Sequence, residues 1–519
     1  MAVIGIDLGT TNSVIARFQG GEPEVLENLD GHRTTPSVVS LTDSGFVVGQ
    51  QAQNQLVSRP DRTVGSIKRY IGADESLTLG DRAFTPTELS SAIIEYLKRS
   101  AEAALGTEVT AAVITVPAYF DHQQRIATKE AARLADLDVL RILNEPTAAC
   151  LPYGLRERGN DTTVLVYDLG GGTFDVSIVT ITDGVFDVCG TDGDDQLGGD
   201  DWDGAIVDWL LEKLLMDYNT SVPDPMPLQL EERLFDAART AKHDLSNQTT
   251  AEISIPFLEV GDDTITLEAS LSREEFAAMN AEKTDRTIDI ATSLQEDVTV
   301  QSLDEIILVG GATRMPMIRN ALTDAFGMEP LAGVRVDEAV ARGAAIQANL
   351  LGKKNLPDVA EESPTRPSVP GDESDEIVLI DSTPKALGVE TYEHGTDRLF
   401  FSNIIPRHAS IPAHNTRDEY CTRHDFQRFI EIPVLQSKTA TLEDATELDT
   451  FELGPVPERP AGEVEFSVEF TLTEDSTLVV AVEDAEGFAK EEIEIRSAVE
   501  TDEAELAQQK QELPALANK

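Results

Sequence analysis

The chain has 519 residues, of which 41% are hydrophobic and only 5% aromatic, and its formal net charge is −53 at pH 7. A chain of this length exceeds what one hydrophobic core usually serves, so several domains are expected. The strong negative charge disfavours nonspecific binding to nucleic acid. No apolar run approaches the roughly 20 residues that a membrane span needs. The composition therefore predicts a multidomain protein that binds neither nucleic acid nor membranes.

The cysteines and the N-terminus indicate a compartment. Cys150, Cys189 and Cys421 are too widely spaced for a disulfide framework or a metal signature. The chain passes from Met1 directly into an apolar stretch without a basic segment or a cleavage site. We therefore expect a reducing cytoplasm. The acidity has two interpretations, which are a solvated, self-repelling surface and an adaptation to high cytosolic salt.

Two glycine-rich segments share one layout. Residues 4–18 read IGIDLGTTNSVIARF and residues 165–182 read LVYDLGGGTFDVSIVTIT. In each, an apolar strand ends in Asp-Leu-Gly, and a second strand follows after small and hydroxyl residues, which predicts a β-hairpin. A glycine turn exposes N–H groups that bind anions, and the nearby acids argue for a bound cation. One such turn is commonplace, but the repeat predicts two similar halves closing around one nucleotide.

The sequence up to about residue 350 alternates strands with helices. This order is typical of a mostly parallel, doubly wound α/β core. Thr85-Pro86-Thr87-Glu88 has the form of a capping box at a helix start. The expected helices cover residues 85–104, 123–135, 202–216, 229–245, 272–297 and 337–348. The expected strands cover residues 111–116, 139–143, 252–256, 264–268 and 306–309.

The composition changes after residue 352. Residues 353–376 are rich in Pro, Ser, Glu and Asp and open an expected linker that extends to residue 384. Within it, the apolar residues 377–380 followed by Asp381 are either a docking segment or a first β-strand, or serve as both. Residues 385–497 show short strands and turns, as in an all-β domain. Residues 498–519 form a polar tail that is too short for a domain.

Five motifs, in order, resemble those of DnaK-type chaperones, the heat shock protein 70 family. They are IDLGTTN at 6–12, VPAYF at 116–120, NEPTAA at 144–149, DLGGGTFD at 168–175 and VGGATRMP at 309–316. The resemblance is strong over residues 2–350 and weaker over 377–497. It implies an actin-like α/β ATPase domain at 1–352, whose two lobes (1–167 and 168–352) are duplicated ribonuclease-H-like units. An all-β sandwich that binds peptides would follow at 385–497.

The resemblance also implies an activity and partners. The protein would be an ATPase and an ATP-dependent chaperone in the stress response, using ATP/ADP, Mg²⁺ and K⁺. Its partners would be extended hydrophobic segments of unfolded proteins, a J-domain co-chaperone and a nucleotide exchange factor.

Individual residues take roles from the resemblance. Those that would organise Mg²⁺, its waters and K⁺ are Asp7, Asp168 and Asp175. Those that would serve hydrolysis are Lys68, Glu145, Asp168 and Thr173. Those that would contact the nucleotide are Gly9, Thr10, Thr11, Asn12, Gly170, Gly171, Gly172, Gly198, Gly199, Lys242, Ser246, Gly310, Gly311, Arg314 and Asp337. Those that would couple the domains are Pro117, Arg125, Arg141, Leu379 and Asp381. Those that would contact peptide are Tyr392, Cys421, Arg423 and Ile430.

Several positions depart from the family pattern. Arg239 stands where the family usually has an acid for the ribose hydroxyls, and His243 beside it is unusual. Tyr392 and Arg423 replace small residues of the arch over the peptide. The linker is longer than usual, and no helical lid follows residue 497, so the chain is either naturally lidless or shortened. Without a lid, bound peptide should dissociate faster.

Two other functions are considered. A sugar kinase of the same actin-like superfamily would need an acceptor pocket with a general base, and would not explain the linker and the β domain. A holdase or exchange partner that binds nucleotide without turnover would be consistent with Arg239 and the missing lid.

Overall fold

The computed structural model describes most of the chain. The described residues are 2–73, 75–154, 161–218, 220–261, 263–298, 300, 302–331, 335–355, 377–392, 398–474, 477–487, 489–495 and 503–517. Of the expected linker, residues 356–376 therefore lie outside the described part. Among the helices of the described residues, none is long and apolar enough to cross a membrane.

The first lobe is built on a sheet of order β11-β10-β1-β2-β3, in which β4 also pairs with β2. Its strands are β1 (Ala2–Asp7), β2 (Asn12–Gln19), β3 (Glu22–Val25), β4 (Thr35–Pro36), β10 (Val109–Val116) and β11 (Asp138–Asn144). β1 and β2 form the predicted antiparallel hairpin, and β1, β10 and β11 are parallel. Helices α2 (Pro86–Leu105) and α3 (His122–Leu134) pack together, and α2 begins with the predicted capping box.

A smaller part of the first lobe carries short elements. A three-stranded sheet of order β6-β5-β7 and a two-stranded sheet β8-β9 lie here. The elements are β5 (Val39–Thr42), β6 (Gly45–Val48), α1 (Gln50–Gln53), η1 (Pro60–Arg62), β7 (Thr63–Val64), η2 (Ile67–Tyr70), β8 (Leu77–Leu79) and β9 (Arg82–Phe84). β6 is the last named strand of its sheet and pairs there with β5. The turn η2 follows β7 and positions Lys68.

The second lobe repeats the scheme. Its sheet has the order β17-β12-β13-β14-β18-β21. The lobe's own strands are β12 (Thr162–Leu169), β13 (Phe174–Thr182), β14 (Val185–Asp194), β15 (Thr250–Val260), β16 (Asp263–Ser272) and β17 (Glu305–Val309). Its helices are α5 (Gly199–Tyr218), α6 (Leu228–Asn247), α7 (Arg273–Met279), α8 (Ala281–Asp297), η3 (Gly311–Arg314) and α9 (Pro316–Phe326). β12 and β13 form the second predicted hairpin, with Asp168 opposite Asp175.

Two helices pack at the junction of the lobes, and one corrects a predicted boundary. α10 (Ala339–Asn355) was expected to belong to the second lobe, but it packs against β1, β2 and α4 (Glu145–Gly154). Glycines allow this close approach: a Cβ on Gly343 would lie 1.8 Å from the carbonyl oxygen of Ala148. Helix α4 itself was not among the expected helices. The chain therefore crosses between lobes more often than a single division at 167/168 implies.

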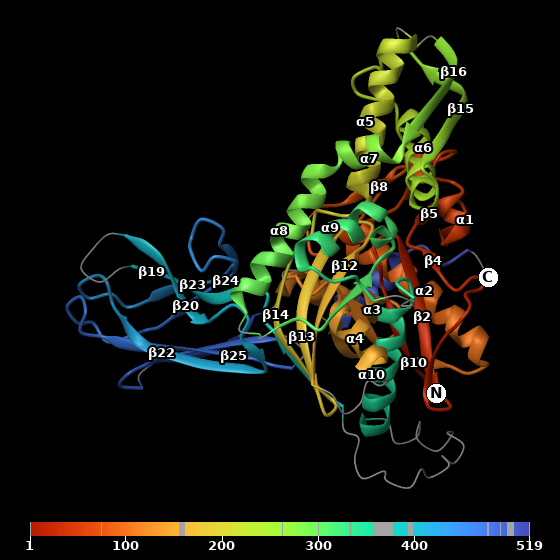
Figure 1. Ribbon diagram of the computed structural model, residues 1–519. Coiled ribbons are helices and arrows are strands. Elements are labelled where there is room, and N and C mark those ends of the chain that lie inside the picture. The colour runs from red at the N-terminus through yellow and green to blue at the C-terminus, as the bar shows by residue number, and fades with distance from the viewer. Residues whose placement is uncertain are drawn as a thin grey trace.

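The β domain is a sandwich of two four-stranded antiparallel sheets. One has the order β20-β19-β23-β24 and the other β22-β25-β26-β27. The strands are β19 (Ala386–Tyr392), β20 (Leu399–Ile405), β22 (Ala413–Cys421), β23 (Ile430–Ser437), β24 (Thr446–Leu453), β25 (Glu465–Leu472), β26 (Leu478–Asp484) and β27 (Lys490–Glu494). Alternate residues of β25 and β26 face the shared core, as their period of two predicts. Figure 1 shows the sandwich to one side of the two lobes, next to β13 and β14.

Two segments connect the sandwich to the lobes. β18 (Val378–Ser382) pairs in parallel with β14, and it also pairs with β21 (Ser410–Ile411), so residues 377–381 are both a docked segment and a strand. The tail contains helix α11 (Glu503–Glu512). Figure 1 marks the C-terminus near β4 and α2, on the far side of the lobes from the sandwich.

Candidate functional site

A cavity of about 600 Å³ lies between the lobes. Both glycine-rich hairpin turns open into it, so Asp7 and Asp168 share one cleft. The predicted site residues that line the cavity are Asp7, Gly9, Thr10, Thr11, Asn12, Lys68, Glu145, Asp168, Gly170, Gly171, Thr173, Gly199, Lys242, Ser246, Gly310, Gly311, Arg314 and Asp337. Gly172, Gly198 and Asp175 lie behind this lining.

The two turns touch each other at the base of the cavity. A Cβ on Gly171 would lie 1.7 Å from the hydroxyl oxygen of Thr11, so only glycine fits there. A Cβ on Gly198 would lie 2.5 Å from the backbone nitrogen of Gly172, so these two glycines serve the packing of the turns. The Thr11 hydroxyl is buried and has no hydrogen-bond partner among the described residues. A buried hydroxyl without a partner favours a ligand that supplies one, and a phosphate oxygen does so.

Lys68 and Glu145 form a buried ion pair in the cavity. The ammonium nitrogen of Lys68 donates to Oε1 of Glu145 at 2.5 Å. Lys68 is placed by η2 and Glu145 is the first residue of α4, so the pair joins two parts of the first lobe. The ring of Phe120 lies 5.6 Å from the same ammonium group.

Acidic side chains surround this pair. Asp7 ends β1, Asp168 lies near the end of β12, and Asp175 accepts a hydrogen bond from the backbone N–H of Tyr119 at 2.9 Å. Burial, followed by the charge of Glu145, raises the pKa of Asp7 to about 7 and that of Asp175 to about 8. The same two causes raise the pKa of Asp168 well above its usual value. Burial first, and the neighbouring carboxylates second, therefore outweigh the opposing effect of the Lys68 charge on these pKa values.

This arrangement fits a magnesium ion that arrives with a nucleotide. Within the described ranges, no three His, Cys, Asp or Glu side chains converge as a protein-only metal cluster. Mg²⁺ keeps several waters and is commonly held by one or two carboxylates together with substrate phosphates. The excess of buried carboxylates beside two anion-binding turns matches that mode.

The far end of the cavity carries basic residues. Lys242 on α6 donates to the carbonyl oxygen of Gly199 at 2.8 Å and to the carboxylate of Asp203 at 2.7 Å. Arg239 lies one turn earlier, with Nε 4.0 Å from Asp203. Asp203 is fully buried and was missed in the sequence, although it lies one turn beyond the second glycine of Gly198-Gly199 on an amphipathic start of α5. Asp203 of α5 is therefore the carboxylate that lies against the basic residues at this end of the cavity.

The remaining predicted residues of this end lie near the mouth of the cavity. Arg314 pairs with the carboxylate of Asp337, and both side chains are about half exposed. The Ser246 hydroxyl donates to the carbonyl oxygen of Lys242 at 3.1 Å. Gly310 has φ of +81°, and a Cβ there would lie 2.3 Å from the carbonyl oxygen of Leu169. Arg314 and Asp337 therefore line the cavity while remaining partly exposed to solvent.

The predicted coupling residues extend from the cavity toward the sandwich. Arg125 is buried and donates to the carbonyl oxygens of Phe120 at 3.1 Å and Ala118 at 3.0 Å. It therefore fixes the turn that follows Pro117. Burial lowers the pKa of the Arg125 guanidinium, while Asp381 is the largest influence in the opposite direction.

Asp381 is the most heavily contacted residue of the docked strand. It accepts from the Thr147 hydroxyl at 2.8 Å and from the Asn144 amide at 3.2 Å, and Arg141 lies 3.6 Å away. Leu379 pairs with Phe186 of β14 and packs in the core between the lobes. The motif residues of the first lobe and the edge strand of the second lobe therefore hold the same segment.

A second contact between the sandwich and the lobes was not predicted. Asp192 of β14 is buried and binds Arg407 at 2.8 Å and Lys438 at 2.7 Å, both from the sandwich. No motif signals this cluster, because its members are separated by more than two hundred residues. It fixes the sandwich beside the docked strand.

The predicted peptide-contacting residues lie at the end of the sandwich. The guanidinium of Arg423 stacks over the ring of Tyr392 at 3.3 Å, so these two side chains are in contact. Cys421 ends β22 and is partly buried. Ile430 is buried in the core of the sandwich, so its side chain is not presented to solvent in this structure.

The comparison with protein families gives one match. The family model described as Hsp70 protein matches residues 3–78 and 75–519. The match includes both glycine-rich turns, the docked strand and the sandwich. Hsp70 proteins are ATPases that bind ATP or ADP with Mg²⁺ and act as chaperones on unfolded polypeptides together with co-chaperones. With its match extending over the lobes and the sandwich alike, the chain belongs to the Hsp70 family.

Proposed function

We propose that this chain hydrolyses ATP in the cleft between its lobes and uses the cycle to control how tightly the sandwich holds extended hydrophobic peptide. One observation carries the proposal. The cavity with the Lys68–Glu145 pair and the strand β18 that leads to the sandwich share one continuous set of contacts, through α4, whose first residue is Glu145 and whose third is Thr147.

The side chains have distinct parts in hydrolysis. The glycine turns and the hydroxyls of Thr10, Thr11 and Thr173 bind the phosphates. Lys68 stabilises the charge that develops on the transferred phosphoryl group. Glu145 orients the attacking water. Asp7, Asp168 and Asp175 would organise Mg²⁺, its waters and K⁺, and the metal would supply charge neutralisation.

Coupling uses a two-state strand. With ATP bound, the lobes close, β18 lies beside β14, and the sandwich is held in a form with low peptide affinity. Hydrolysis relaxes the cleft, and Asp381 leaves Arg141 and Thr147. A ligand shifts such an equilibrium only by its differential affinity for the two states, and here the states differ by the contacts of Asp381 and Asp192.

The surroundings of the two sites suggest the partners. Peptide would lie under the arch of Tyr392 and Arg423 as an added strand, with main-chain hydrogen bonds and apolar pockets. A J-domain co-chaperone would contact the surface near Arg141. A nucleotide exchange factor would open the cleft. These assignments follow the family pattern, and the compartment is proposed to be the cytoplasm.

The test is ATP turnover with Mg²⁺ and K⁺, in the absence and presence of an unfolded hydrophobic peptide. Turnover that rises with peptide supports the proposal. Tight nucleotide binding with no turnover under any condition would instead favour a holdase, and phosphate transfer to a sugar would favour a kinase. Turnover that ignores peptide would leave hydrolysis standing and contradict the coupling.

A further inference from the structure

The C-terminal segment lies on the first lobe, far from the sandwich that precedes it. The carbonyl oxygen of Ala515 accepts from the backbone N–H of Phe46 at 2.9 Å, and the N–H of Ala517 donates to the carbonyl oxygen of Phe46 at 2.7 Å. Leu516 and Phe46 thereby form a parallel bridge at the free edge of β6. The tail thus adds a short strand to the β6-β5-β7 sheet.

Apolar side chains anchor this strand. Leu516 is 8% exposed and belongs to the hydrophobic core of the first lobe, which also contains Phe46. Leu513 packs against the same core, and Ala517 packs against a neighbouring cluster that includes Val47. Burial of the apolar Leu516 side chain, together with the packing of Leu513, favours the docked position of the tail.

The lobe surface has a shape that fits this segment. Gly45 has φ of +125°, and a Cβ there would lie 2.0 Å from the carbonyl oxygen of Ala515. The backbone of the tail therefore approaches β6 where a side chain would block it. Pro514 lies between the two leucines and has no N–H, so the extended segment leaves no donor unsatisfied at that position.

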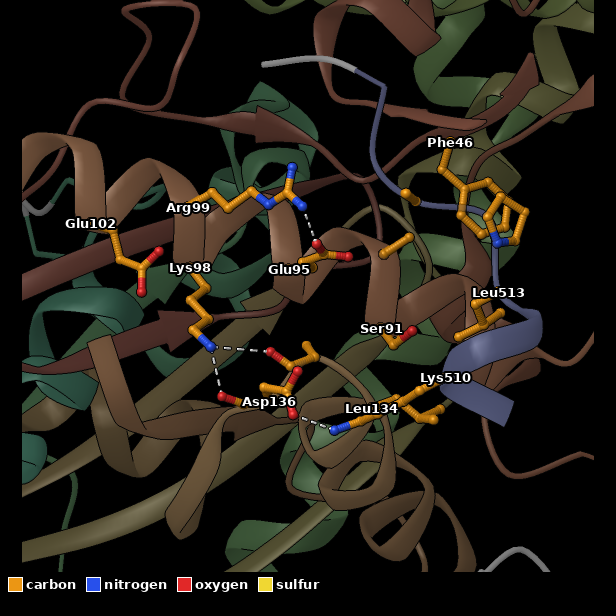
Figure 2. A pocket seen from close by; sticks show the side chains of 14 residues that line it. Phe46, Ser91, Glu95, Lys98, Arg99, Glu102, Leu134, Asp136, Lys510 and Leu513 are labelled. Atoms are coloured by element: carbon orange, nitrogen blue, oxygen red, sulfur yellow. Dashed lines mark hydrogen bonds and ion pairs between the residues drawn. The ribbon is translucent and has the colours of Figure 1, made fainter. Parts of the chain in front are cut away.

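Polar contacts hold the helix that precedes the strand. Lys510 pairs with the carboxylate of Asp136, and Arg82 donates to the carbonyl oxygen of Glu512 at 3.0 Å. A cavity of about 310 Å³ remains between α11 and α2. Figure 2 shows Phe46 and Leu513 on one side of this cavity, with Lys98 directed toward Asp136 on the other.

We propose that the free edge of β6 is a peptide-docking site, separate from the nucleotide cleft and from the sandwich, and that this chain fills it with its own residues 513–517. Such strand addition gives affinity through the main chain and specificity through side-chain pockets. The ligand pattern is two leucines three positions apart in an extended segment. β18, which precedes the sandwich, contacts both lobes, whereas the tail that follows the sandwich binds the β6 edge of the first lobe. This inference goes beyond ATP turnover and does not depend on it.

The experiment uses the full chain and two matched variants. Leu516→Asp places a charge in the buried position, while Ala507→Asp places the same charge at an exposed position of α11. Amide hydrogen exchange of the segment containing Phe46 is followed by mass spectrometry. We expect exchange to be at least about tenfold faster in Leu516→Asp than in the wild type and in Ala507→Asp. Equal exchange in all three would overturn the proposal.

A second measurement identifies the occupant. A fluorescent synthetic peptide with the sequence of residues 503–519 should bind Leu516→Asp and bind the wild type about tenfold more weakly, because a tethered segment reaches effective concentrations on the order of mM. Binding to neither protein would overturn the site. Protection of Phe46 that disappears on dilution would overturn the intramolecular occupant, since it would place the tail of a second copy there.

A third variant tests the same strand independently, in case Leu516→Asp misfolds. Ala517→Pro removes the N–H that donates to Phe46 and keeps both leucines in place. Nucleotide affinity reports an intact cleft in every variant. Faster exchange at Phe46 in Ala517→Pro with unchanged nucleotide affinity supports the site, and unchanged exchange in Ala517→Pro contradicts the hydrogen-bonded strand.

Discussion

Lys68 and Glu145 form a pair whose desolvation costs free energy, because each side chain is almost fully buried. The carboxylates of Asp7 and Asp168 add like charge to this site. Such an arrangement is a poor way to stabilise a fold. It is a good way to prepare a cavity for a cation and a phosphate, because the protein charges are already oriented when the ligand arrives.

Replacing Thr173 by alanine tests the hydroxyl at the phosphate end. Thr173 lines the cavity and is 6% exposed, and its backbone carbonyl accepts the N–H of Gly170 irrespective of its side chain. We expect ATP turnover to fall by about tenfold or more, with nucleotide affinity largely retained. Steady-state turnover and fluorescent-nucleotide titration measure the two. Thr182→Ala, at the exposed end of β13, is the control, and equal turnover in both variants would remove Thr173 from the mechanism.

The acid cluster predicts how stability depends on pH. Asp7 and Asp175 have folded pKa values of about 7 and about 8 against 3.8 for the free group. The folded, nucleotide-free protein therefore binds these protons more tightly than the unfolded chain. The contribution of these two groups to the free energy of unfolding is therefore largest below about pH 4. It is lost as the pH rises through about 8.

Asp7→Asn should remove part of the loss of folding stability that accompanies rising pH. At pH 8 we expect the free energy of unfolding of the nucleotide-free variant to exceed that of the wild type by on the order of 1 kcal/mol. Urea unfolding in EDTA at pH 6 and pH 8 provides the comparison. Asp263→Asn, at the exposed tip of β16, should behave as the wild type. Parallel pH profiles for Asp7→Asn and wild type would contradict the assignment.

At the scale of elements, β18 links the chemistry to the sandwich. It is short, and its backbone pairs with only three residues of β14. Most of its specificity therefore comes from Asp381 and Leu379, whose side chains reach the first lobe and the core between the lobes. A strand held by few bonds can leave and return without unfolding either sheet.

Asp381→Asn should uncouple the two domains. The amide can keep a hydrogen bond with Thr147, but it loses the charge that faces Arg141. We expect stimulation of turnover by peptide to drop about fivefold or more, while turnover without peptide changes little. Turnover with and without an unfolded peptide measures both quantities, with Asp263→Asn as the control for loss of one acid. Full stimulation in Asp381→Asn would refute the role of β18.

The strongly patterned elements could be predicted from the sequence. The hairpins, the capping box at Thr85 and the alternation in β25 depend on local chemistry, so they are readable without a structure. Helix α4 could not be predicted, because Pro146 at its second position looks like an interruption, whereas the first turn of a helix tolerates proline. The packing of α10 on the first lobe depends on small residues such as Gly343, whose partners lie far away in the chain.

In the candidate site too, residues carried by local motifs could be predicted, and residues that depend on distant partners could not. Its glycine turns and acids were predicted because motifs carry them, and most of them line one cavity. Asp203 and Asp192 were missed, since each is an ordinary acid in an acidic chain until its partners are known. The docked tail was missed because strand addition is made by the backbone, and the two leucines at 513 and 516 are too few for a periodic pattern.

At the scale of the molecule, charge is the dominant feature. There are 94 acidic residues against 41 lysines and arginines, which gives a net charge of −53. Repulsion of this size destabilises the compact state. Salt screens it over distances beyond about 8 Å at physiological ionic strength, while close, buried pairs such as Lys68–Glu145 are screened much less.

Thermal stability should therefore rise with KCl up to molar concentrations. The reason is that screening relieves the long-range repulsion of the many acids more than it weakens the few buried pairs. Thermal unfolding followed by circular dichroism from 0.1 to 2 M KCl tests this. NaCl at matched concentrations separates general screening from an effect of K⁺ in the cleft. A flat or falling midpoint would reject adaptation to high salt.

The sheet of the second lobe ends on strands that belong to another domain. β14 has backbone neighbours on both sides only where β18 lies beside residues 185–187. When β18 departs, that row of N–H and C=O groups becomes an open template for a foreign strand. Molecules that have released β18 should therefore self-associate as the protein concentration increases. Under the proposed cycle, a shortage of ATP leaves more molecules with β18 released, so self-association should increase.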